Sequence, residues 1–266
     1  MHKGRPLKVS YGAGVDSTAM LIGLNRLGIR PDLILFADTG GELPETYDYL
    51  PIIGRWLKAK GLPPVTIVKN ASPRAGHKSL EGECLTLGTV PSISYRANHS
   101  CAMKWKIAPQ DKFCNHFAPF REAWARRERV ITAIGYDAGA GDGRRLCKAF
   151  DAQEVAKKKS KRWFRKYDYW YPLVDWGWDR ATAEQVIRSE LLPVPVKSSC
   201  FFCGARTKPE IVKLAVTHPD LFRRAVAIEV NARPKLRKIK GLGTRFAWGE
   251  FFEQNRLRVL DPEGTR

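Results

Sequence analysis

Short apolar runs alternate along this chain with longer stretches in which apolar positions recur at helical spacing. Each apolar run is followed by small or polar residues, which is typical of a buried strand that ends in a loop. The runs predict strands at 8–11, 33–37, 65–68 and 130–134. The helical spacing predicts helices at 18–26, 45–60, 110–117, 120–127, 181–190, 208–217 and 219–230. Because strands alternate with helices, we expect an α/β fold with a doubly wound, mostly parallel sheet flanked by helices.

Two further stretches have no such pattern. Residues 71–100 are irregular and rich in Ser and Gly, which predicts a mobile loop over a site, and residues 134–144 form a Gly-rich loop after a strand. No internal repeat is present. We expect one α/β domain over 1–230 and a basic extension over 231–266. A content of 44% hydrophobic residues supports a substantial core.

The first strand enters a loop of small residues, Gly12-Ala13-Gly14, and a helix then opens through Asp16, Ser17 and Thr18. Small residues let the backbone approach a bound group, and the amides of a helix start attract phosphate. The spacing is neither that of a Walker loop nor Gly-x-Gly-x-x-Gly. The alternative is an ordinary turn from strand to helix, capped by Asp16 or Ser17.

The second strand also ends in polar residues, Asp38-Thr39-Gly40-Gly41-Glu42-Leu43-Pro44-Glu45-Thr46. A helical stretch separates the two strands, which predicts a βαβ unit with parallel strands. Both loops then follow the carboxyl ends of strands, where open α/β sheets bind their ligands.

These two segments resemble the PP-loop ATPases, and within them the phosphoadenosine-phosphosulfate (PAPS) reductase-like branch. The family has Ser-Gly-Gly-x-Asp-Ser where this chain has Gly12-Ala13-Gly14-Val15-Asp16-Ser17, so Gly12 and Ala13 depart from its pattern. The second segment matches closely, and the resemblance extends to about residue 229. It implies cleavage of ATP between the α- and β-phosphates, with transfer of AMP.

The resemblance also implies roles for individual residues. Asp16 would hold Mg²⁺, and Asp38 and Thr39 would lie beside the adenosine. The cations that would neutralise the α-phosphate are Lys104, Lys106 and Arg144. The two lysines equally suit a solvated helix start. Pyrophosphate would be bound by Ser10, Gly12, Ala13, Gly14, Ser17 and Thr18.

Cysteine spacing suggests a metal centre. Cys200-Phe201-Phe202-Cys203 is a C-x-x-C turn, and Cys101 lies in a segment that resembles the cluster-binding part of the family, with Ser100 in place of a second Cys. Three ligands leave three possibilities open: a [4Fe–4S] cluster with one open iron, a cluster or zinc site completed by Cys84 or His99, or a metal-free redox pair.

The chain carries a formal net charge of +19. The window 144–166 contributes +8 and the window 223–245 contributes +7. The clustered cations are interleaved with the aromatic residues Trp163, Phe164, Tyr167, Tyr169 and Trp170. Cations for backbone phosphate and aromatics for unstacked bases indicate nucleic acid, tRNA or DNA. The alternative is a solvated basic face.

Together these features predict an ATP-dependent enzyme that modifies nucleic acid, most simply a sulfur transferase with a sulfur donor or carrier protein as partner and a possible homodimer. One alternative is a sulfonucleotide or sulfate-assimilation enzyme acting on PAPS or APS, but the chain has no Cys after Cys203 to serve as that family's nucleophile. Another is a non-catalytic nucleotide- or DNA-binding module. Because neither a signal peptide nor a long apolar segment is present, we expect a cytoplasmic protein without membrane contact.

Overall fold

The computed structural model describes residues 4–70, 77–95, 100–159 and 162–260. The chain divides into two compact units, each made of several segments. Unit 1 comprises Met1–Ala37, Pro44–Val68 and Gln110–Ser198. Unit 2 comprises Asp38–Leu43, Lys69–Pro109 and Ser199–Arg266. The boundary that we expected after residue 230 falls inside helix α12 (Pro219–Ala232) of unit 2.

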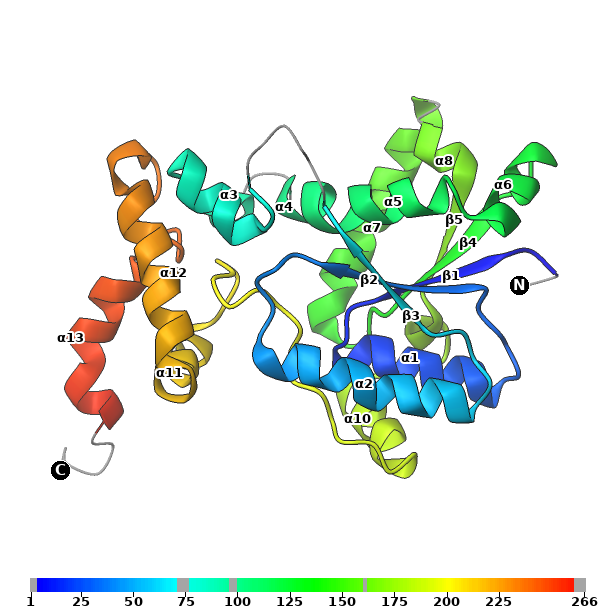
Figure 1. Cartoon of the computed structure of the whole chain (residues 1–266), viewed down its shortest axis with the longest axis horizontal. Helices are drawn as coiled ribbons and strands as arrows, with labels where there is room; N and C mark the ends of the chain where they lie inside the picture. The colour runs from blue at the N-terminus through cyan, green and yellow to red at the C-terminus, as the bar shows by residue number, and fades with distance from the viewer. Residues whose placement is uncertain (1–3, 71–76, 96–99, 160–161, 261–266) are drawn as a thin grey trace. The chain divides into compact units, whose positions relative to one another are not determined.

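Unit 1 is built on a five-stranded parallel sheet with the order β3-β2-β1-β4-β5 (Figure 1). The predicted α/β fold with a parallel sheet is therefore confirmed. Four of the strands were expected from their apolar runs, and β5 was not, because aromatic and charged residues alternate in it. The strands are β1 (Leu7–Tyr11), β2 (Leu33–Asp38), β3 (Val65–Lys69), β4 (Val130–Ile134) and β5 (Tyr167–Trp170).

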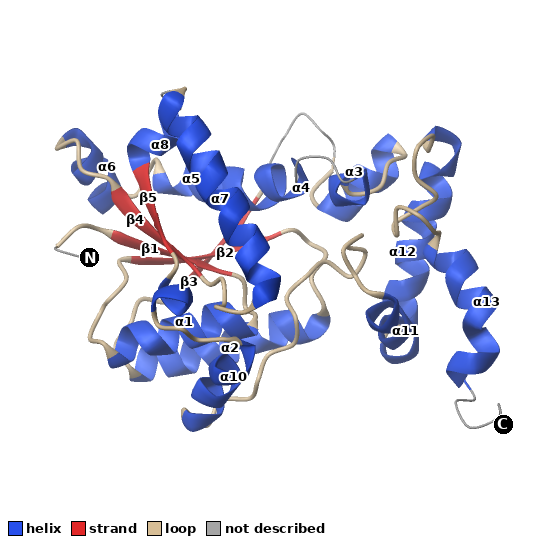
Figure 2. Cartoon of the chain, turned by 180° about the vertical axis from the view of Figure 1, so that it is seen from behind, coloured by secondary structure: helices blue, strands red, loops and turns tan. Residues whose placement is uncertain are grey.

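Helices cover both faces of this sheet (Figure 2). Residues two positions apart in a strand point to the same face of the sheet. Leu7 and Val9 of β1 pack into the core on one face, and Leu33 and Leu35 of β2 pack into the core on the other. The first core is closed by α1 (Val15–Arg26), α2 (Pro44–Ala59) and α10 (Arg180–Ser189), and the second by α5 (Ala108–Cys114) and α6 (Ala118–Ala125). The remaining helices of unit 1 are α7 (Ala140–Lys158), α8 (Arg162–Lys166) and α9 (Pro172–Asp175).

Unit 2 is helical in the residues that the structure describes. Its α11 (Lys208–Thr217) begins at a capping box in which the Thr207 amide donates to the Glu210 carboxylate over 2.7 Å, which explains why the predicted start is correct. The stretch 71–100, expected to be irregular, contains α3 (Leu80–Leu87) and a 3₁₀ turn at Ser92–Tyr95; that expectation was wrong for these residues. Its residues 71–76 and 96–99 lie outside the described part. The unit also contains α4 (Ser100–Ala102), a π-helical turn (Met103–Ile107), α12, a 3₁₀ turn (Arg233–Lys235) and α13 (Trp248–Leu260).

Among the helices of the described residues, none is both long and apolar enough to cross a membrane.

Candidate functional site

The loop after β1 is tight and strained. Ala13 is buried and has a left-handed backbone, with φ of 55°. A residue with a Cβ atom pays about 1–2 kcal/mol for that conformation, and strain of this kind gathers at functional sites. The Gly12 amide donates to the Ser17 hydroxyl over 3.2 Å, and the hydroxyl donates in turn to the Gly14 carbonyl over 3.2 Å. The loop therefore has a fixed shape before any ligand binds.

The side chains of two residues expected to bind pyrophosphate have polar partners elsewhere within unit 1. The Ser10 hydroxyl donates to the Gln110 side chain of α5 over 3.2 Å. Thr18 is fully buried, and its hydroxyl lies 3.2 Å from the Tyr11 hydroxyl. Ser10 and Thr18 thus support the loop. Because the Gly12 amide and the Ser17 hydroxyl are hydrogen-bonded to each other, the groups left to face a ligand are the other backbone amides of the loop and of the start of α1.

An acidic cluster lies at the start of α1. One carboxylate oxygen from each of Asp16, Asp137 and Asp142 falls within 4.8 Å of the others. Strand pairing explains the arrangement: β1 and β4 are parallel neighbours, with Ser10 beside Ile134, so the loops that follow them meet at one edge. Oxygen ligands of this kind are those that Mg²⁺ takes in proteins.

Charges at the cluster act on one another. Burial raises the pKa of Asp16, Arg180 lowers it, and Asp137 and Asp142 raise it further. The Arg180 guanidinium lies 3.4 Å from Asp16, and the Arg145 guanidinium lies 2.9 Å from Asp142. The cluster contains three carboxylates, and two guanidinium groups pair with it. A divalent cation bound there would reduce the repulsion that remains between the carboxylates.

Sequence reasoning selected Arg144 for this loop, but Arg144 is exposed on α7 and its neighbour Arg145 holds Asp142. Asp137, Asp142 and Arg180 were not selected at all. The Gly-rich loop 134–144 carried the signal for the two aspartates, since it follows a strand at the same edge as Gly12–Gly14. Nothing local in the sequence marks Arg180, which reaches Asp16 from α10.

In unit 2, the segment after β2 packs on the C-x-x-C turn. The Thr39 hydroxyl lies 3.2 Å from the Cys200 sulfur, and Thr39 is 1% exposed. The Phe201 amide donates to the Gly41 carbonyl over 2.7 Å. Asp38 accepts the Gly40 amide over 2.8 Å and pairs with Lys69 over 2.9 Å. Thr39 thus contacts the cysteine turn in this structure, and both carboxylate oxygens of Asp38 have protein partners.

Fully buried Glu42 pairs with the partly exposed Lys106 beside the same thiols, with 3.0 Å between the ammonium nitrogen and the carboxylate. Burial alone would lower the pKa of Lys106, but Glu42, Cys200 and Cys203 together raise it. The second oxygen of Glu42 is buried and has no hydrogen-bond partner among the described residues. Lys104 pairs instead with Glu83. Each of the two lysines expected at a phosphate is therefore held by a glutamate.

The candidate metal-binding cysteines all belong to unit 2. Burial raises the pKa of Cys203, and a charge on Cys101 raises it further. Burial and the charges of Glu83 and Cys101 raise the pKa of Cys84 to about 12. His99, the other possible fourth ligand, lies outside the described residues.

The described cysteines do not form a cluster of ligand atoms for a single metal ion. Sulfur ligands about 2.3 Å from one zinc ion lie within about 4 Å of each other. Among the described residues, no three ligand atoms that include a cysteine fall within 4.8 Å of one another. The described cysteines are therefore not gathered into a preformed metal centre in this structure. A [4Fe–4S] cluster binds each cysteine at a different iron and holds the sulfurs further apart.

The two basic windows lie in different units. Lys157, Lys158 and Lys159 of the first are exposed at the end of α7. Several cations of the second are used inside unit 2: Arg224 binds Glu81, and Arg233 binds Glu250 over 2.5 Å. The first window therefore offers more cations to a partner.

No known protein-family model matches the chain, and no curated protein matches its sequence. The parallel sheet with the order β3-β2-β1-β4-β5 nevertheless makes unit 1 a Rossmann-like α/β domain.

Proposed function

We propose that this protein is an ATP-dependent enzyme that modifies nucleic acid by adenylylation followed by sulfur transfer. The observation that carries the proposal is the acidic cluster of Asp16, Asp137 and Asp142 beside the strained Gly12–Gly14 loop. A phosphate-binding loop and carboxylates for Mg²⁺ at one edge of a parallel sheet are what cleavage of a nucleoside triphosphate requires.

In this proposal, the amides of Ala13 and Gly14 and those at the start of α1 bind the β- and γ-phosphates, which leave as pyrophosphate. Asp16, Asp137 and Asp142 would hold Mg²⁺, whose charge offsets that of the phosphates. Arg180 and Arg145 each form an ion pair at the cluster and would stabilise charge that develops on the α-phosphate. The acceptor oxygen of the nucleic acid takes AMP, and a sulfur nucleophile then displaces it.

Cys101, Cys200 and Cys203 would hold a [4Fe–4S] cluster, with Cys84 as the fourth ligand or one iron left open. When bound, the cluster would carry the sulfur to be transferred. Lys106 offsets the negative charge of the thiolates, and Glu42 fixes Lys106 in place. A sulfur donor or carrier protein completes the reaction, and tRNA or DNA binds to the exposed cations of α7.

The six cysteines are free, which agrees with the cytoplasmic location that the proposal includes. A homodimer is compatible with the proposed chemistry but is not required by it.

Release of pyrophosphate from ATP tests the proposal. The wild-type protein, incubated with ATP, Mg²⁺ and tRNA or DNA, should release pyrophosphate, and Asp16→Ala should abolish release while the protein keeps its fold. Asp151→Ala is the matched control, because Asp151 is an exposed carboxylate on α7. Turnover of APS or PAPS in place of ATP would favour a sulfonucleotide enzyme. ATP binding without pyrophosphate release would favour a non-catalytic module.

A further inference from the structure

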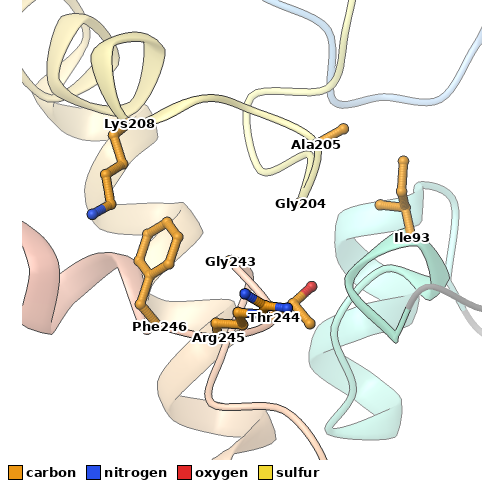
Figure 3. Close-up of a pocket in the computed structure, with 8 residues that line it drawn as sticks. All are labelled: Ile93, Gly204, Ala205, Lys208, Gly243, Thr244, Arg245 and Phe246. Atoms are coloured by element: carbon orange, nitrogen blue, oxygen red, sulfur yellow. The ribbon is translucent and has the colours of Figure 1, made fainter.

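A pocket of about 580 Å³ lies within unit 2, next to the C-x-x-C turn (Figure 3). Its volume is in the range of pockets that hold a small ligand, about 300–1,000 Å³. Gly204, which directly follows Cys203, forms one part of the wall. The remaining wall residues used below are Lys208, Gly243, Thr244, Arg245 and Phe246.

The pocket wall is positive and aromatic. Lys208 and Arg245 contribute two cations, and none of the described residues that line the wall is acidic. Lys208 is also the first residue of α11, where the amides of the helix start add positive potential. Its ammonium nitrogen lies 5.6 Å from the centre of the Phe246 ring and 5.2 Å from that of Phe251, and Figure 3 shows the Lys208 side chain beside Phe246. An anionic group and a flat ring can therefore be bound side by side.

The turn that carries Phe246 is held in place before any ligand binds. Thr244 has a left-handed backbone, with φ of 59°, and its hydroxyl donates to the Ser94 carbonyl over 2.6 Å. A Cβ atom on Gly243 would come within 2.6 Å of the Phe246 ring, so only glycine lets the ring lie against the turn. A wall that is already ordered loses little conformational entropy on binding.

A buried carboxylate supports this turn from behind. Glu229 is 2% exposed and accepts the amides of Leu242 and Trp248, each over 2.9 Å. Burying a carboxylate is costly unless hydrogen bonds compensate it. The hydrogen bonds that offset the burial of Glu229 also hold the loop in one shape.

We infer that this pocket binds one nucleotide unit, with its phosphate on Lys208 and Arg245 and its base stacked on Phe246. Aromatic side chains next to cations bind nucleotides in this way without sequence preference. The inference rests on the proposed function where it takes a nucleic-acid strand as the source, since a free mononucleotide offers the same chemistry. Because Gly204 adjoins Cys203, a nucleotide bound here would lie beside the cysteine turn.

Binding of short labelled single strands, DNA and RNA, by the full-length protein tests the inference through fluorescence anisotropy. Phe246→Leu keeps an apolar side chain but removes the stacking plane, and should weaken binding about fivefold or more. Lys208→Gln and Arg245→Gln should each lower the slope of log affinity against log salt by about 0.7. Lys213→Gln is the matched control, because Lys213 is an exposed cation of α11 outside the pocket wall.

AMP added as a competitor separates the two sources. Displacement of the strand by micromolar AMP supports the pocket with a mononucleotide as its ligand, and resistance to AMP supports it with a strand. The inference is overturned if Phe246→Leu, Lys208→Gln and Arg245→Gln, each with wild-type thermal unfolding, bind strands and AMP as the wild type does. Pyrophosphate release is measured in the same preparations. Pocket-dependent binding without any release would reject the proposed function and keep the pocket.

Discussion

Gly135 lies against Ser17 so closely that a Cβ atom on Gly135 would come within 2.9 Å of the Ser17 backbone nitrogen. Side chains do not approach a backbone to that distance, so only glycine allows the contact. Gly135 is the first residue after β4, and Ser17 follows Asp16 in the first turn of α1. The contact therefore sets how near the loop with Asp137 and Asp142 comes to Asp16.

We predict that Gly135→Ala separates this loop from α1. The added methyl group meets backbone that cannot move aside cheaply, and overpacking of this kind costs about 1–3 kcal/mol of unfolding free energy. Urea unfolding measures the loss. Gly141→Ala is the control: no atom lies within 4 Å of a Cβ there, and an alanine inside α7 should stabilise the protein by up to about 1 kcal/mol. Equal effects of the two substitutions would contradict the packing argument.

We predict that Mg²⁺ stabilises the wild-type protein and does so far less in Asp16→Asn. A cation at 100 times its Kd would add about 2.7 kcal/mol to the free energy of unfolding. Thermal unfolding in MgCl₂ and in EDTA measures the difference. Asp151→Asn should respond like the wild type, and an unchanged response in Asp16→Asn would remove Asp16 from the metal site.

The same carboxylate predicts a pH dependence in EDTA. Burial raises the pKa of Asp16 in the folded state, with Asp137 and Asp142 adding to the effect. A group with a raised folded pKa favours folding while protonated, so its contribution to stability falls as pH rises through that pKa. We expect Asp16→Asn to lose less stability than the wild type between pH 4 and pH 7. Parallel curves of unfolding free energy against pH would contradict this.

We predict that Cys200 is slow to alkylate in metal-free protein. Burial and the charge of Glu42 raise its pKa to about 12, although Lys106 lowers it. Since the thiolate is the nucleophile, the rate with iodoacetamide should rise about tenfold per pH unit above pH 8. The exposed Cys147 is the internal control. Mass spectrometry follows both sites, and fast modification of Cys200 at pH 8 would refute the expected protonation.

We predict about four iron and four sulfide per chain in protein purified without oxygen, and a loss of both in Cys101→Ser. Cys147→Ser should keep the wild-type content. One equivalent of zinc without sulfide would reject the cluster. Iron content that is unchanged in Cys101→Ser would exclude that ligand.

We predict that Lys157→Glu with Lys158→Glu weakens binding of tRNA or DNA and lowers its salt dependence, because each lost phosphate contact releases about one counterion fewer. Arg55→Glu with Lys58→Glu reverses two exposed cations of α2 and is the matched control. Equal affinities for the two double variants across a salt titration would show that α7 contributes only net charge.

The sequence by itself determined the elements whose pattern is local. Buried strands of a parallel sheet appear as apolar runs, and β4 begins and ends at the predicted residues. The capping box fixed the start of α11 for the same reason, since its two partners are three residues apart. The loop at Gly12–Gly14 was placed correctly between a strand and a helix because its small residues interrupt two apolar segments.

Only the tertiary structure decided which distant groups meet. Arg180 reaches Asp16 across 164 positions, and Thr39 reaches Cys200 across 161. Strand order decides such contacts: β4 is the neighbour of β1, which brings Asp137 and Asp142 to Asp16, and no local pattern encodes that order. The helix α7 was missed because glycines and charges fill its first turns and because it has no apolar stripe, with only Asp142 and Ala156 buried along its length. Local patterns fix where elements begin and end, but long-range packing assembles the site.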